Sequence, residues 1–153
     1  MSKETPKHIG SLNKSFSKKF NDSSDEEFNF HLIQFGDKQI LNISINGILD
    51  TTFKLPISTK RTIDYESMMD LNEDDDDQIN ENRFLPEPQL LIGDYSNMKI
   101  SIIASQIGKI ISLNYPKETI LSIGSKWFGK GNEVNDDDFE KLSFIIENVK
   151  KLF

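Results

Sequence analysis

A concentrated run of acidic residues is the feature that most constrains how this chain can fold. Ten of the 25 acidic residues of the 153-residue chain lie between Asp64 and Glu87, against one basic residue, Arg83. Like charges packed this densely repel one another and cannot enter a hydrophobic core. We therefore expect a disordered acidic insertion over about residues 58–87, which leaves the flanking segments to build the fold.

Outside this stretch the charge is nearly balanced. The rest of the chain holds 15 acidic and 17 basic residues, so the net charge of −7 describes one segment and not the folded surface. Tight nucleic-acid binding needs a continuous basic face, which this distribution does not supply. We expect no nucleic-acid partner.

The rest of the chain has the length of one domain. Residues 1–26 are polar and rich in Ser and Lys, and they predict a disordered N-terminal arm. Residues 27–153 predict a single domain that carries the acidic insertion. The apolar stretches are too short to cross a bilayer, and the N-terminus lacks the apolar block of a secretory signal. We expect no membrane partner and a cytoplasmic protein, with the nucleus as an additional compartment.

Alternating apolar residues predict strands before the insertion. Residues 28–35 alternate on both faces, as in a strand that is covered on both sides. Residues 39–46 also alternate and form a hairpin with the first strand. The polar side chains of this second strand share one face and should meet solvent: Asn42, Ser44 and Asn46. Residues 51–55 are β-branched and aromatic and predict a third strand.

The segment after the insertion predicts alternating strands and helices. Residues 89–92 read as a short buried strand, and Ser96 or Asn97 can cap the helix that follows. The apolar residues of this helix fall at helical spacing: Ile100, Ile103, Ala104, Ile107, Ile110 and Ile111. Residues 117–125 alternate again and predict the last strand.

The C-terminal segment has clear helix signals. Asp137 and Glu140 have capping-box spacing at its start, and Lys150 and Lys151 suit its negative end. Its apolar side chains are expected to point inward: Phe139, Leu142, Ile145, Ile146 and Val149. The whole order of elements predicts a single α+β domain, with a mainly antiparallel sheet of about five to six strands and two packing helices.

Residues 124–131 nearly match a phosphate-binding loop. The match fails at Gly131, where the hydroxyl that would hold magnesium is missing, and the next predicted helix begins too late to face a phosphate. Trp127 and Phe128 within this loop could instead anchor a protein interface, or Trp127 could simply cap the core. Nucleotide binding remains a minor alternative, which predicts magnesium-dependent stabilisation by nucleotide.

The side chains needed for catalysis are scarce. The chain has no cysteine and only two histidines, His8 in the arm and His31 in a strand. Thiol catalysis and cysteine-ligated metals are excluded, and His31 lacks a second histidine for a metal site. We expect no enzyme activity, no cofactor and no metal site, so the protein should act by contact.

The ordered part of the chain resembles the proteasome assembly chaperone 4 family, as a fungal-type member. The resemblance runs from about Phe28 to Phe153 and depends on the Phe-x-Phe-His start of the first strand and on Leu90-Leu91-Ile92-Gly93-Asp94. It implies a non-catalytic chaperone that pairs with the paralogous proteasome assembly chaperone 3. It also implies a role in forming the alpha ring of the 20S core particle, through contact with alpha subunits and especially the fifth.

Two apolar groups are candidates for these contacts. We expect Ile48, Leu49 and Phe53, which flank a turn, to meet the paralogue, and Trp127 and Phe128 to meet the alpha subunit. The same order of strands and helices also suits a small α+β scaffold or adaptor module in trafficking or signalling. Such a scaffold should bind membrane-linked GTPases or their regulators, whereas the chaperone should bind free alpha subunits.

Overall fold

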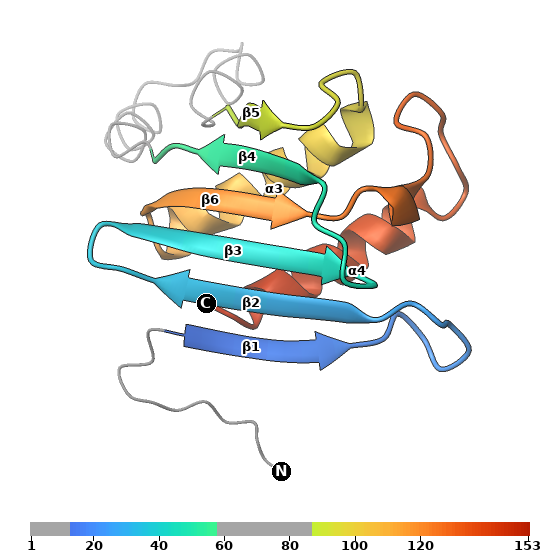
Figure 1. Cartoon of the computed structure of the whole chain (residues 1–153), viewed down its shortest axis with the longest axis horizontal. Coiled ribbons are helices and arrows are strands. Elements are labelled where there is room, and N and C mark those ends of the chain that lie inside the picture. The colour runs from blue at the N-terminus through green and yellow to red at the C-terminus, as the bar shows by residue number, and fades with distance from the viewer. Residues whose placement is uncertain (1–12, 58–86) are drawn as a thin grey trace, which may run out of the picture.

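The computed structural model describes residues 13–57 and 87–153, which form one sheet and two helices (Figure 1). The elements follow in the order β1 (Asn13–Lys18), β2 (Phe28–Gln34), β3 (Lys38–Ile45), β4 (Thr51–Leu55), β5 (Gln89–Ile92), α3 (Met98–Asn114), β6 (Glu118–Ile123), the 3-10 turn η3 (Lys126–Phe128) and α4 (Asp138–Lys150). The predicted α+β class, with two packing helices on a mainly antiparallel sheet, is confirmed. The acidic run expected within 58–87 lies almost entirely outside the described residues.

The sheet has six strands in the order β1-β2-β3-β6-β4-β5. Four of the five neighbouring pairs are antiparallel. Strand β6 lies between β3 and β4 and runs parallel to β3. Helix α3 connects β5 to β6. Both helices lie on the same face of the sheet, behind it in the view of Figure 1, so the other face has no helix over it.

The core lies between the helices and the covered face of the sheet. The α3 stripe is buried as predicted, from Ile100 to Ile111, and the side chain of Asn97 caps this helix by accepting from the Ile100 N–H. Burial of each isoleucine is worth roughly 1.5–3 kcal/mol, which offsets the modest helix propensity of β-branched residues. Docking on the sheet therefore stabilises α3. Within the described residues, neither helix is long and apolar enough to cross a membrane.

The prediction of a disordered arm over residues 1–26 is wrong for its second half. Residues 13–18 form β1, which pairs with β2 along its whole length. The ring of Phe16 stacks on Phe30 with centroids 5.2 Å apart, and Phe20 meets Trp127 edge-on. Every second residue of β1 is polar and exposed, so the strand resembles a solvated arm in sequence. Residues 1–12 lie outside the described part of the chain.

Two strands are less covered than expected. In β2, Phe28, Phe30 and Leu32 are buried, but His31 and Ile33 are only half-buried, because no helix packs on their face in the described residues. The predicted buried strand at 89–92 is the edge strand β5, and its Leu91 and Ile92 are exposed. An apolar run of four residues does not reveal whether its strand has one neighbour or two.

The start of α4 also differs from its prediction. Ile145 and Val149 are buried as expected, whereas Phe139, in the first turn of α4, is exposed. Asp137 occupies the cap position, but its side chain makes no capping hydrogen bond. It forms an ion pair with Lys141 instead, so the expected capping box is absent.

Candidate protein-binding surfaces

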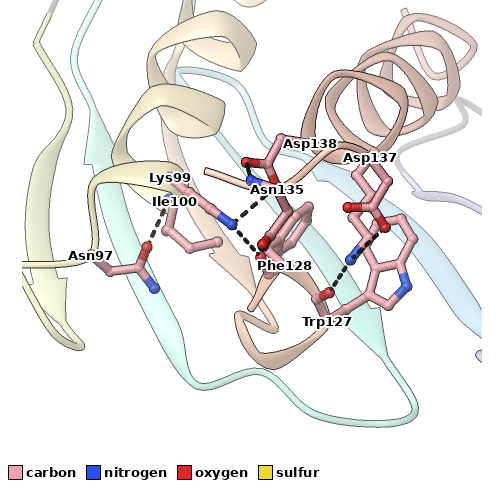
Figure 2. A network of polar contacts seen from close by, with 9 residues as sticks. Asn97, Lys99, Ile100, Trp127, Phe128, Asn135, Asp137 and Asp138 are labelled. Atoms are coloured by element: carbon pink, nitrogen blue, oxygen red, sulfur yellow. Dashed lines mark hydrogen bonds and ion pairs between the residues drawn. The ribbon is translucent and has the colours of Figure 1, made fainter. Parts of the chain in front are cut away.

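Two lysines hold the loop between β6 and α4 (Figure 2). The Lys99 ammonium on α3 donates to the Phe128 carbonyl at 2.9 Å and to Asp138 Oδ1 at 3.0 Å. The Lys141 ammonium on α4 donates to the Trp127 carbonyl at 2.7 Å. The two helices thereby bind successive carbonyl groups of η3, and the loop has a fixed position between them.

Trp127 and Phe128 are part of this fixed core. Phe128 is buried, and Trp127 is half-buried against Phe28 and Phe144, with the Lys141 ammonium 4.9 Å from its ring centroid. A buried ring cannot reach a partner without opening the domain. Phe128 is therefore not accessible to an alpha subunit in this structure, whereas contact through Trp127 stays a prediction. The alternative, that Trp127 caps the core, fits its contacts.

The glycines that resemble a phosphate-binding loop have packing reasons of their own. A Cβ added at Gly124 would lie 2.6 Å from the Ile48 carbonyl oxygen, and one at Gly131 would overlap Asn97. Both positions need glycine because another segment of backbone passes close by. The next long helix, α4, begins only at Asp138.

The first group of candidate contacts also contains both buried and exposed residues. Phe53 is buried in the core of β4, whereas Ile48 and Leu49 are exposed at the turn between β3 and β4. Phe53 alternates along β4 with residues that face the solvent, so its own side chain points to the core. Ile48 and Leu49 are therefore the residues of this group that a partner can reach.

The uncovered face of the sheet, which we call the open face, carries a short apolar row. Ile33, Ile40 and Ile120 are direct neighbours across β2, β3 and β6, and all three are half-buried. The next row is polar, with Asn42 beside Ser122 and a 3.0 Å hydrogen bond between Thr52 and Ser122. An apolar row inside a polar frame is typical of a face that another protein covers.

His31 belongs to the polar part of the open face. Its Nε2 lies 2.7 Å from Asn13 Oδ1 on β1. Among the described residues, no group of three or more His, Asp or Glu side chains is placed to hold a metal ion. His31 is therefore explained by a cross-strand hydrogen bond.

A second surface lies on the helix side of the sheet. The first halves of α3 and α4 and the loop at 131–134 enclose an apolar groove of about 580 Å³. The backbone N–H of Asn135 and the Lys99 ammonium both hydrogen-bond Asp138 and lower the pKa of its carboxyl, which therefore stays charged at the edge of the groove. We call this feature the α3/α4 groove.

The sequence predicts that the solvent-facing side of the strand with Asn42, Ser44 and Asn46 is available to a partner, but it predicts neither the apolar row nor the groove. The alternation of β3 places Ile40 on the solvent side, whereas Ile33 was expected to be covered because β2 alternates on both faces. The pattern also does not show that Ile120 lies beside Ile40, because β6 joins β3 only in the folded sheet. For the groove, the sequence pattern gives less information than it does for the open face. Phe139 fits the inward stripe of α4 by spacing, and only the packing of the helices shows that it faces the groove.

Comparison with known proteins agrees with the fold. A solved structure from yeast, described as a novel chaperone complex for 20S proteasome assembly, contains a similar chain with a TM-score of 0.63 and 20% identity. The similarity covers 92% of the present chain and 98% of the yeast chain. No curated protein matches the sequence. The family model described as 20S proteasome chaperone assembly proteins 3 and 4 matches residues 1–150, nearly the whole chain, and the protein therefore belongs to this family.

Proposed function

We propose that this chain is a non-catalytic chaperone that pairs with a paralogous family member and promotes formation of the alpha ring of the 20S proteasome. Family membership supports the role in assembly. The observation that carries the pairing is the open face of the sheet, where Ile33, Ile40 and Ile120 form an apolar row. Of the two family types, we propose member 4 for this chain, member 3 for its partner, and the fifth alpha subunit as a client.

The open face suits a pairing surface for a physical reason. A sheet with helices on one side is stable in water only if its second face is polar or becomes covered. The row of isoleucines interrupts an otherwise polar face, and a matching face on the paralogue would remove it from water. Ile48 and Leu49 are further candidates for contact with the paralogue, since both are exposed beside the last residues of β3.

A single substitution tests the pairing surface. We expect Ile40→Lys to abolish capture of the paralogue, because it places a charge at the centre of the apolar row, while the variant still folds, because the side chain is on the open face. Leu113→Lys is the matched control, since Leu113 is an exposed aliphatic residue on α3. Unchanged pairing in a folded Ile40→Lys variant would remove the open face from the proposal.

Affinity purification of the tagged chain from its own cells, at gentle salt and with mass spectrometry, tests the function itself. We expect a paralogue of similar size and proteasome alpha subunits, with few mature beta subunits. Recovery of membrane-linked GTPases or their regulators in their place would favour the scaffold hypothesis and contradict the assembly role. The proposed place of action is the cytoplasm and nucleus, which imaging of the tagged chain tests.

A further inference from the structure

The α3/α4 groove carries a cluster of exposed apolar side chains. Its volume of about 580 Å³ lies within the roughly 300–1,000 Å³ typical of ligand pockets. Four apolar side chains at the groove are unusually exposed: Met98 at 61%, Ile102 at 51%, Val134 at 94% and Phe139 at 76%. Ile103 and Leu142 lie deeper in the same groove. Clustered exposure of this kind marks an interaction surface.

The edge of the groove is acidic. The segment from Gly129 to Glu140 contains five acidic residues and one basic residue, Lys130. Lys99 and Lys141 reach this segment from the helices and pair with Asp138 and Asp137. The other three carboxylates have no ion-pair partner among the described residues: Glu133, Asp136 and Glu140. An occupant with basic groups beside its apolar part would complement this edge.

The groove is also preformed. Lys99 ties its loop to α3 through the Phe128 carbonyl (Figure 2). Gly131 packs directly on Asn97, so the loop wall lies against the helix N-terminus. Lys141 holds the other end of η3. A partner that enters this groove does not have to order the loop first, which reduces the entropic cost of binding.

We propose that the α3/α4 groove is a docking site for a segment of a partner protein that inserts one or two large aliphatic or aromatic side chains, with Lys or Arg beside them. The apolar floor accepts the inserted side chains between Ile102 and Leu142, and the Glu133 carboxylate at the edge pairs with the basic residues. The groove lies on the helix side of the sheet, opposite the open face. The chain can therefore hold a paralogue and a second protein at the same time, and the proposal does not depend on the identity of the paralogue.

Three short synthetic peptides test this proposal on the full chain. The first carries Leu and Phe three residues apart with flanking lysines, the second has the same core with flanking glutamates, and the third keeps the lysines but replaces Leu and Phe with Ser. Labelled methionine methyl groups are the reporter, because Met98 lies in the groove. We expect the first peptide to shift the Met98 signal and to bind at least about tenfold more tightly than the other two.

Substitutions then locate the binding. Ile102→Ser and Phe139→Ser should each weaken the first peptide about tenfold, since each removes an apolar contact at an exposed position that leaves the core intact. Leu113→Ser, on the same helix but outside the groove, should change nothing. Glu133→Lys should remove the preference for lysine over glutamate, whereas Glu147→Lys, an exposed α4 position outside the groove, should keep it.

Three outcomes would overturn the proposal. The first is that no peptide shifts the Met98 signal at concentrations up to about 1 mM. The second is equal binding of the lysine and glutamate peptides, which would remove the basic partner. The third is a Met98 shift caused by a small apolar compound such as indole but by none of the peptides, which would make the groove a small-molecule site. Circular dichroism and thermal melting of each variant show that a loss of binding is not a loss of folding.

Discussion

The loop from Ser125 to Asp137 shows how single residues set the shape of this molecule. Lys99 and Lys141 come from different helices, and each satisfies one backbone carbonyl and one carboxylate. Hydrogen bonds to charged groups are worth roughly 1.5–3 kcal/mol, more than neutral ones. These lysines therefore fix a segment that has little regular secondary structure of its own.

Gly131→Ala tests the close approach between this loop and α3. The added Cβ would overlap Asn97, whose backbone cannot move without disturbing the start of α3, so we expect a loss of about 1–3 kcal/mol in the free energy of unfolding. Gly36→Ala is the control, because a Cβ there meets nothing within 4 Å. Urea denaturation of both variants measures the difference. Equal midpoints would show that the loop moves away from Asn97 freely.

The charge on Asp138 makes stability depend on pH. Its pKa is lowered first by the backbone N–H of Asn135 and next by the Lys99 ammonium. A lowered folded pKa stabilises the native state above the pKa of the unfolded chain, about 3.9, and this contribution is lost as the pH falls through the folded value. We expect stability to decline below about pH 4.

Asp138→Asn should make the decline of stability at acid pH shallower, because the variant has no carboxylate to protonate. It should also lower the stability at pH 7, because the charged carboxylate is missing. Chemical denaturation at a series of pH values measures both effects. Asp136→Asn is the control, since Asp136 is an exposed carboxylate without a lysine partner in the described residues. An unchanged slope in Asp138→Asn would contradict the assigned hydrogen bonds.

At the scale of elements, β1 is the strand whose role differs most from its sequence. It pairs with β2 through residues Asn13 to Lys18 and contributes Phe16 to the aromatic cluster over α4. Lys14 adds a hydrogen bond to the Leu152 carbonyl beyond the end of α4. These contacts connect the two ends of the described chain.

Two truncations separate β1 from the residues before it. Removal of residues 1–12 should leave the denaturation midpoint almost unchanged, since β1 begins at Asn13. Removal of residues 1–20 deletes Phe16, Phe20 and the β1 ladder, and we expect it to cost about 3 kcal/mol or more. It also turns β2 into an exposed edge that favours aggregation. Equal stability of the two truncated chains would show that β1 adds nothing to the fold.

At the scale of the whole molecule, the sheet separates two surfaces of different chemistry. The open face has an apolar row in a polar frame, and the α3/α4 groove has an apolar floor with an acidic edge. Because the sheet and its core lie between them, substitutions on one surface should not affect the other. Distant sites of this kind usually act additively.

A pair of variants tests this independence. Ile40→Lys should abolish binding of the paralogue and leave binding of the lysine-flanked peptide unchanged. Ile102→Ser should weaken the peptide and leave pairing unchanged. Pulldown with the paralogue and peptide titration, each done on both variants, give the four results. Loss of both functions in one folded variant would show that the surfaces are coupled.

The sequence by itself determined the elements that depend on local pattern. The α3 stripe, the Asn97 cap and the β2–β3 hairpin all follow from spacing and turn chemistry within a short stretch of chain. The absence of cysteine likewise excluded thiol chemistry. In each case the physical cause acts between residues that are close in sequence, so the pattern alone is enough.

Only the tertiary structure decided which surfaces are free. Phe53 and Phe128 are buried, whereas Phe139 and Ile92 are exposed, although all four are large apolar residues in or beside regular elements. Their exposure depends on which element packs over them, and that depends on pairings such as β3 with β6 that join residues far apart in the chain. Local propensity carries no information about such partners. The open face and the α3/α4 groove therefore appear only when the sheet is assembled and its helices are seen to lie on one side.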